Sequence, residues 1–310
     1  AFLLPRLMPM DPVQQTISQY QSFGAYIPPE RLEEIIGTLK QLYGLEGSLW
    51  QQYVGFWRRL FAGDFGPSLT QYPAPVIELI GKHLPWTLGL LFPTTVLGWL
   101  IGTLIGGVAG YHFRARWTRV LDGIAMFLRP IPYYIMAILL LILFAYVFPV
   151  FPLSGGMGIG QSLSFDLKSI GNLLWHAALP ALSLIIGAMA EHFQAMKLIV
   201  QSVRSEDYVG YAKAGGVKEG KIAFRYVIRN AMLPRITHLG LTFGQLFSGA
   251  LITEMVFAYP GIGWLLYNAV MKADYNLIMG ITCISIIAIT TSILILDLIY
   301  PLMDPRVRYQ

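Results

Sequence analysis

Five long apolar segments make up most of the chain after its first quarter. They cover residues 84–109, 120–147, 173–200, 231–255 and 277–300. Each is longer than the roughly 20 apolar residues that a helix needs to cross a bilayer, so each could cross with some tilt. The pattern therefore predicts five complete transmembrane helices.

The residues before these segments have a different character. Residues 1–12 are apolar but too short to cross, so we expect them to be the end of a first transmembrane helix; an interfacial anchor is the alternative. Residues 13–83 look like extracytoplasmic and interfacial material, with an amphipathic helix predicted over 29–42 and closed by Gly44. An aromatic-rich helix predicted over 49–61 is expected at the membrane interface, where Trp and Tyr gather.

A polar island, residues 205–234, separates the third and fourth apolar segments. Ser205 is a plausible N-cap for a short helix over 206–214, because acidic residues follow it in the first turn. Gly215 and Gly216 supply a C-terminal stop. A second helix with an apolar stripe is predicted after them, and the stripe residues are Phe224, Val227 and Ile228.

The first of these helices has an apolar stripe of its own. Tyr208, Tyr211 and Ala212 recur at i, i+3 and i+4, the spacing with which a helix docks into a groove. The stripe could fit a groove on another protein, or it could pack only against helices of the same chain.

Composition supports a membrane protein. The chain of 310 residues is 55% hydrophobic and 13% charged, with a mean hydropathy of +0.57, whereas about 25% of the residues of a soluble protein are charged. The net charge of +5 resides in short loops, which indicates membrane topology rather than nucleic-acid binding. The single cysteine, Cys283, lies in an apolar segment, so no disulfide framework or Cys/His zinc motif is expected.

Loop charges predict the orientation. The loop between the first two complete segments carries three arginines and no acid, the loop over 148–172 holds only Lys168 against Asp166, and the loop over 202–229 is basic. Because cytoplasmic loops are rich in Lys and Arg, the first and third of these should lie inside the cell. With the first helix counted, the chain is predicted to have six spans and two cytoplasmic termini.

The first complete segment carries Gly98, Gly102, Gly106 and Gly110 at intervals of four. A stripe of small residues lets helices approach closely in lipid. We favour helix packing as its role, with a sliding gate as the alternative.

Enzyme signatures are missing. The sequence has no G-x-x-x-x-G-K-[ST] phosphate loop, no H-E-x-x-H and no G-x-S-x-G. Its five histidines are scattered, and a lone His192 is more often a polar packing residue than a metal ligand. The chain is therefore expected to be no enzyme and to bind no metal or cofactor.

The polar island resembles the cytoplasmic coupling loop of ABC importer permeases, in which an alanine-rich helix is followed by a glycine and later by Leu-Pro. The matching positions are Ala212, Ala214, Gly216 and Leu233-Pro234. Gly210 and Tyr211 stand where the general pattern has Glu and Ala. This departure, together with residues 207–209 and 229–234, resembles the peptide/nickel branch. Further similarities to that branch lie at residues 4–12, 63–69, 253–263, 274–275, 296–298 and 304–309.

The resemblance implies an all-α polytopic membrane protein. Residues 1–12 would end the first transmembrane helix, 13–83 would be extracytoplasmic and interfacial, and 84–310 would be a five-helix permease core with its coupling loop at 202–229. The ATPase-contacting coupling helix implied by the resemblance comprises Glu206, Asp207, Tyr208, Tyr211, Ala212, Lys213, Ala214, Gly215 and Gly216.

The resemblance also implies partners and a location. The chain would form half of a pathway with a second, related permease, dock two cytoplasmic ATPase subunits that bind ATP and Mg, and receive substrate from an extracytoplasmic binding protein. Its place would be the cytoplasmic membrane of a bacterium or archaeon. Peptide is the favoured substrate, with oligosaccharide and nickel as alternatives.

The alternative function is a self-contained secondary transporter. It would couple substrate to protons through Arg129, Glu191 and Lys197. No inverted repeat is apparent, and the coupling loop would be unexplained. Arg129 and Glu191 each lie ten residues from the predicted cytoplasmic end of their helix, about 15 Å deep at 1.5 Å per residue. They are expected to pair or to share a polar network, the alternatives being separate contacts with water or with the partner permease.

Overall fold

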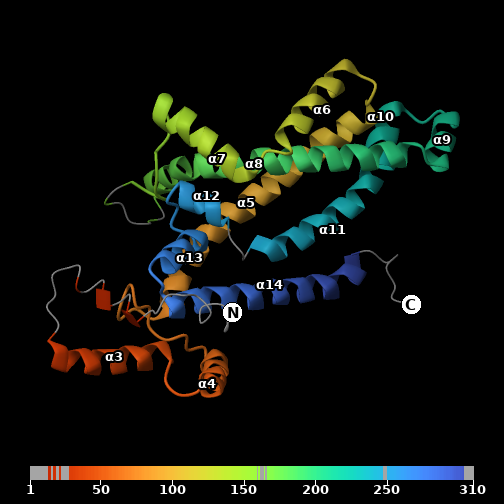
Figure 1. Ribbon diagram of the computed structural model, residues 1–310. Coiled ribbons are helices and arrows are strands. Elements are labelled where there is room, and N and C mark those ends of the chain that lie inside the picture. The colour runs from red at the N-terminus through yellow and green to blue at the C-terminus, as the bar shows by residue number, and fades with distance from the viewer. Residues whose placement is uncertain are drawn as a thin grey trace. The chain divides into compact units, whose positions relative to one another are not determined.

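The computed structural model describes residues 13–14, 17–18, 21, 28–158, 160, 164, 166–246 and 250–303. Over these residues the chain is helical apart from its connecting loops and an isolated bridge between Pro67 and Pro75 (Figure 1). The expectations for residues 1–12 and for the motif at 304–309 fall outside the described residues. The chain divides into two compact units, and each is described by itself.

The first unit comprises residues up to Thr87 together with residues 260–288. Its N-terminal helices are α3 (Pro29–Tyr43) and α4 (Leu49–Phe61), which confirms both predicted helices to within one residue. Gly44 ends α3 with φ of 65°, the left-handed conformation that glycine adopts without strain. Ser48 and Gln51 form a capping box that fixes the start of α4.

The core of the first unit is built around the beginnings of two long helices, α5 (Val76–Tyr111) and α14 (Tyr275–Met303), and around α13 (Ile262–Met271). Buried aliphatic side chains at Val76, Leu79, Leu265 and Ile281 meet there. Ser68 and residues next to it are held at the start of α14 by the carboxylate of Asp274, whose residue has no exposed surface.

The second unit comprises residues 88–259 and 289–310. Besides parts of α5 and α14, its helices are α6 (Arg116–Leu128), α7 (Tyr133–Leu141), η1 (Ile142–Val147), α8 (Leu167–Arg204), α9 (Asp207–Ala214), α10 (Glu219–Lys221), η2 (Ile222–Ile228), α11 (Arg229–Gln245) and α12 (Leu251–Val256).

The glycine stripe lies where α5 crosses α8. A Cβ added at Gly102 would lie 2.6 Å from the carbonyl oxygen of Met189, and one at Gly106 would lie 2.4 Å from that of Phe193. No side chain fits at such distances, so the two backbones are in direct contact. The structure confirms close packing as the role of the stripe.

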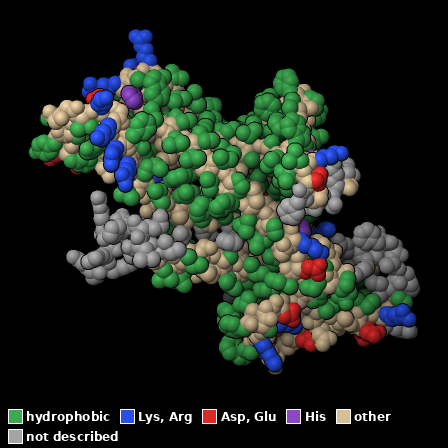
Figure 2. Space-filling model, turned by 180° about the vertical axis from the view of Figure 1, so that it is seen from behind, with side chains coloured by type: hydrophobic (Ala, Val, Ile, Leu, Met, Phe, Trp, Pro, Cys, Tyr) green, Lys and Arg blue, Asp and Glu red, His purple; other side chains and the backbone are tan. Residues whose placement is uncertain are grey.

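The described residues contain three helices long and apolar enough to cross a membrane: Val76–Tyr111, Leu167–Arg204 and Tyr275–Ile295. Large hydrophobic side chains such as Phe127 and Leu198 are exposed on their surfaces and on that of α6, and Figure 2 shows how much of one face is apolar. Such surfaces are expected where lipid replaces water. The chain is a multi-pass helical membrane protein, and the number six for its spans stays a prediction.

Two predicted spans are not continuous helices. The segment predicted over 120–147 consists of α6 and the α7–η1 pair, which are bent by 94° at a short break. Pro130 and Pro132 lie in that break, and a proline both removes a helical N–H and restricts the residue before it. In the segment predicted over 231–255, α11 ends at Gln245 and α12 begins only after Ala250, whose φ and ψ of −104° and 66° are not helical.

Candidate functional site

The polar island forms a compact cap at the end of α8 (Figure 1), and its first helix begins one residue later than predicted. The N-cap of α9 is Glu206, not Ser205. Because α8 extends to Arg204, Ser205 ends that helix instead, and its hydroxyl donates to the carbonyl of Ser202 at 2.7 Å. Asp207 lies in the first turn, where the helix dipole favours an acid.

The predicted end of the helix is confirmed. Gly215 is its C-cap, and Gly216 takes a φ of 74°. The chain then turns back, with the N–H of Val217 donating to the carbonyl of Ala212 at 3.1 Å. These bonds satisfy carbonyls that a helix end leaves unpaired.

One side of α9 packs against the rest of the chain. Val209 is 1% exposed, and Ala212 packs beside it against Ile222 and Val227, whereas Tyr211 is 77% exposed. Tyr208 and Tyr211 are exposed and Ala212 is partly exposed, so the expectation that these three residues dock into a groove on another protein stays a prediction. Val209 and Ala212, spaced i and i+3, mark the side of α9 that packs against the chain. Val209 is not part of the predicted stripe.

The outer surface of the cap is mostly polar. The exposed members of the predicted contact set are Glu206, Asp207, Tyr208, Tyr211, Lys213, Ala214, Gly215 and Gly216. Their contact with an ATPase subunit stays a prediction.

The second helix of the island starts as α10 and widens into the π-helix η2. Ile222, Ala223 and Val227 are buried, and Phe224 is 63% exposed. The predicted stripe of Phe224, Val227 and Ile228 is thus wrong at Phe224. A π-helix has a longer repeat than the 3.6 residues assumed for the sequence pattern, which changes the buried face.

Specific contacts tie the cap to the long helices. Asn230 of α11 donates to the hydroxyl of Tyr208 at 3.0 Å. The hydroxyl of Tyr111, the last residue of α5, donates to the carboxylate of Glu219, and the guanidinium of Arg204 lies 5.1 Å from the centre of the same tyrosine ring. The ends of α5 and α8 are therefore joined to α9 and η2 in one packed group, here called the coupling cap.

Arg129 and Glu191 do not form a direct ion pair. Arg129 donates to Oε1 of Gln194 at 2.9 Å, and Gln194 lies one turn after Glu191 on α8. The ion pairs in the described part of the chain join Lys197 to Asp122 and Lys82 to Glu78. The equal depth predicted for Arg129 and Glu191 assumes that both helices are continuous. Arg129 instead lies at the bend after α6. A shared polar network stays a prediction.

A cluster that the sequence did not reveal surrounds Arg235 of α11, which is 5% exposed. Its Nη2 contacts Nδ1 of His192, its carbonyl accepts a hydrogen bond from Trp99 at 3.0 Å, and the ring of His238 lies edge-on to His192. His192 is thus a packing partner of a buried cation. No spacing signal links it to Arg235, because the two residues lie 43 positions apart.

Within the described residues, no group of three or more His, Cys, Asp or Glu side chains is arranged to hold a metal ion. Most titratable groups of the coupling cap are exposed or engaged in the contacts above. The described residues form a helical scaffold with an exposed cap.

Comparisons with known proteins identify this scaffold. Residues 102–309 match the family described as binding-protein-dependent transport system inner membrane component. The chain is 28% identical to the dipeptide transport system permease protein of Lactococcus lactis subsp. cremoris, over 91% of this chain and 87% of that protein. It is 30% identical to the oligopeptide transport system permease protein of Bacillus subtilis, over 86% and 83%. It is also 30% identical to the glutathione transport system permease protein of Salmonella choleraesuis, over 100% and 92%. The chain belongs to the family of inner membrane components of binding-protein-dependent transport systems.

Proposed function

We propose that this chain is the permease subunit of an ATP-driven importer of short peptides. The relatives above are named for dipeptide, oligopeptide and glutathione transport, and all three of these substrates are peptides. Peptide is therefore favoured over oligosaccharide and nickel. The chain would form half of the translocation pathway, and a second, related permease would supply the other half.

The observation that carries the proposal is the coupling cap. An exposed short helix, α9, is fastened through Val209 and Ala212 to the ends of the long helices, so a push on α9 is transmitted to α5 and α8. An ATPase subunit that binds ATP and Mg would dock on this surface, and the importer would hold two such subunits. The basic loops support a cytoplasmic position for this surface. The opposite side would receive peptide from a binding protein.

A secondary transporter is the competing function. It would need no ATPase, and α9 would have no receiving surface. Lys197, one of the three charges assigned to proton coupling, is instead paired with Asp122 at 2.7 Å.

Purification and uptake separate the two functions. The tagged chain, expressed in the cells it comes from, should co-purify with ATPase subunits, and liposomes containing the complex and its binding protein should accumulate labelled dipeptide only with internal ATP. Accumulation driven by a proton gradient without ATPase subunits would contradict the proposal.

A further inference from the structure

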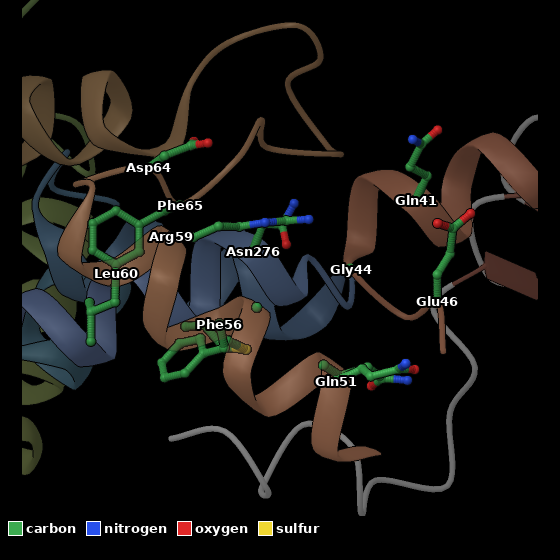
Figure 3. Close-up of a pocket in the computed structure, with 13 residues that line it drawn as sticks. Gln41, Gly44, Glu46, Gln51, Phe56, Arg59, Leu60, Asp64, Phe65 and Asn276 are labelled. Atoms are coloured by element: carbon green, nitrogen blue, oxygen red, sulfur yellow. The ribbon is translucent and has the colours of Figure 1, made fainter. Parts of the chain in front are cut away.

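A pocket in the first unit has no role in the function proposed so far. It encloses about 310 Å³ and is lined by α3, the loop after it, α4 and the start of α14 (Figure 3). This volume lies at the lower end of the roughly 300–1,000 Å³ typical of small-molecule sites. The pocket has space for a ligand the size of a dipeptide and not for a long chain.

Arg59 supplies the pocket with a cation. Its side chain extends across the cavity in Figure 3, and its Nη1 lies 3.3 Å from the position that a Cβ on Gly44 would take. Arg59 is partly buried, and its guanidinium has no ion pair or hydrogen bond within the described part of the chain. A planar guanidinium without a partner is suited to bind a carboxylate through two parallel hydrogen bonds.

Asn276 supplies a fixed acceptor beside it. The residue is 7% exposed, and its Nδ2 donates to the carbonyl oxygens of Leu42 and Pro67 at 3.2 and 3.0 Å. These two bonds set the orientation of the amide. They leave Oδ1 as the acceptor of the side chain, and it has no donor among the described residues.

The remaining walls complete a site for a ligand with two charged ends. Phe56, Leu60 and Phe65 provide apolar and aromatic surface, and the carboxylates of Glu46 and Asp64 stand at exposed positions of the lining. A ligand carboxylate would fit Arg59, and an apolar side chain beside that carboxylate would fit the aromatic surface. A ligand ammonium group would fit the carboxylates of Glu46 and Asp64.

We propose that this pocket binds a short peptide by its C-terminal carboxylate, with Arg59 as the carboxylate partner and the aromatic wall as the surface for the last side chain. The inference rests on the proposed function for the choice of peptide as the ligand. A carboxylate could also come from a side chain of the binding protein, and the experiment below distinguishes the two sources.

The test is equilibrium binding to the complete importer in nanodiscs, without the binding protein. The probes are the dipeptide Ala-Phe and its C-terminal amide. We expect the free acid to bind at least about tenfold more tightly than the amide, because a charge-assisted hydrogen bond contributes roughly twice as much as a neutral one. Arg59→Gln should remove this preference. Arg58→Gln, which changes the neighbouring and exposed arginine outside the lining, should keep it.

A steric variant tests the cavity without changing its charge. Gly55 of α4 lines the pocket and has no atom within 4 Å of a Cβ position, and Gly37 of α3 has equal space but lies outside the lining. Gly55→Leu should weaken binding of acid and amide alike by at least about tenfold, since it fills space that the ligand needs. Gly37→Leu should leave both affinities unchanged.

Three results would overturn the inference: equal binding of acid and amide, an unchanged preference in Arg59→Gln, or a preference that appears only when the binding protein is added. Weaker binding of the binding protein itself in Arg59→Gln, with no binding of free dipeptide, would assign Arg59 to a side chain of that protein. ATP-driven dipeptide uptake is measured on the same preparation. Uptake without pocket binding would contradict only this inference, and pocket binding without uptake would contradict only the proposed function.

Discussion

At the scale of single residues, Asp274 is a fully buried acid of the first unit that accepts several hydrogen bonds. Its Oδ2 accepts hydrogen bonds from the hydroxyl of Ser68 at 2.5 Å, from both the N–H and the hydroxyl of Thr70, and from the N–H of Leu69. Its Oδ1 accepts from the N–H of Leu277 at 3.1 Å. An ionised carboxylate offers only acceptor sites, so every donor that points at Asp274 meets an acceptor.

Asp274→Asn should destabilise the first unit. The amide keeps the shape but turns an NH₂ group toward backbone donors, and a buried donor left unpaired costs roughly 1–3 kcal/mol. Thermal unfolding in detergent should show a lowered midpoint. Asp64→Asn is the matched control, since Asp64 is exposed and its Oδ1 accepts one backbone bond from Gly66. Equal midpoints for the two variants would contradict the assigned role.

The stability of the first turn of α8 should depend on pH through Asp166. It is the N-cap of α8, and hydrogen bonds from Ser164 and Ser169 lower its pKa from 3.8 to about 2. A group whose pKa is lower in the folded state contributes stability that is present above the unfolded pKa and is lost as pH falls through the folded one. Hydrogen exchange in the first turn of α8 should therefore accelerate between pH 3.8 and about 2. Asp166→Asn should show no such step, and an ordinary Asp titration near pH 3.8 in the wild-type protein would contradict the assignment.

Among the helices, the contact between α5 and α8 depends on the absence of side chains. Gly106→Ala would place a Cβ 2.4 Å from the backbone oxygen of Phe193, so the helices would have to separate. Such overpacking typically costs about 1–3 kcal/mol. Gly89→Ala on the same helix meets no atom within 4 Å and should be neutral or slightly stabilising, because Ala favours a helix. Unfolding midpoints of the two variants measure the difference, and a stable Gly106→Ala protein would disprove the close contact.

The sequence predicts those helices best whose ends are fixed by neighbours in the chain. The bounds of α4 were predicted without error, since Ser48 and Gln51 define its start locally. Local sequence patterns do not predict which side chains are buried when burial depends on residues far away in the chain. The buried face of α9 depends on Ile222 and Val227, and the burial of Arg235 depends on His192 of α8. The segment over 120–147 is predicted as one helix although it breaks near Pro130, because the sequence does not show whether a helix resumes in the same direction after a proline.

At the scale of the whole molecule, the orientation in the membrane can be tested directly. In a Cys283→Ser background, cysteines at Ser154 and Ser164 should react with an impermeant thiol reagent added outside intact cells, because their loop carries little positive charge. A cysteine at Lys218, in the basic loop, should react only after the membrane is opened. The reverse pattern would overturn the orientation and the cytoplasmic position of the coupling cap.

The central claim is that the coupling cap transmits ATP hydrolysis to the transport pathway, and Tyr211 offers its most direct measurement. Ala212 is less suitable, since it packs against the chain's own core. Tyr146 is a matched control because both tyrosines are 77% exposed. The measurement is the number of dipeptides taken up per ATP hydrolysed by proteoliposomes containing the complete importer. Tyr211→Ser should lower this ratio at least about fivefold, because it removes a large exposed aromatic side chain from the proposed contact, while Tyr146→Ser leaves it unchanged. An unchanged ratio in Tyr211→Ser, with the complex intact, would contradict the account.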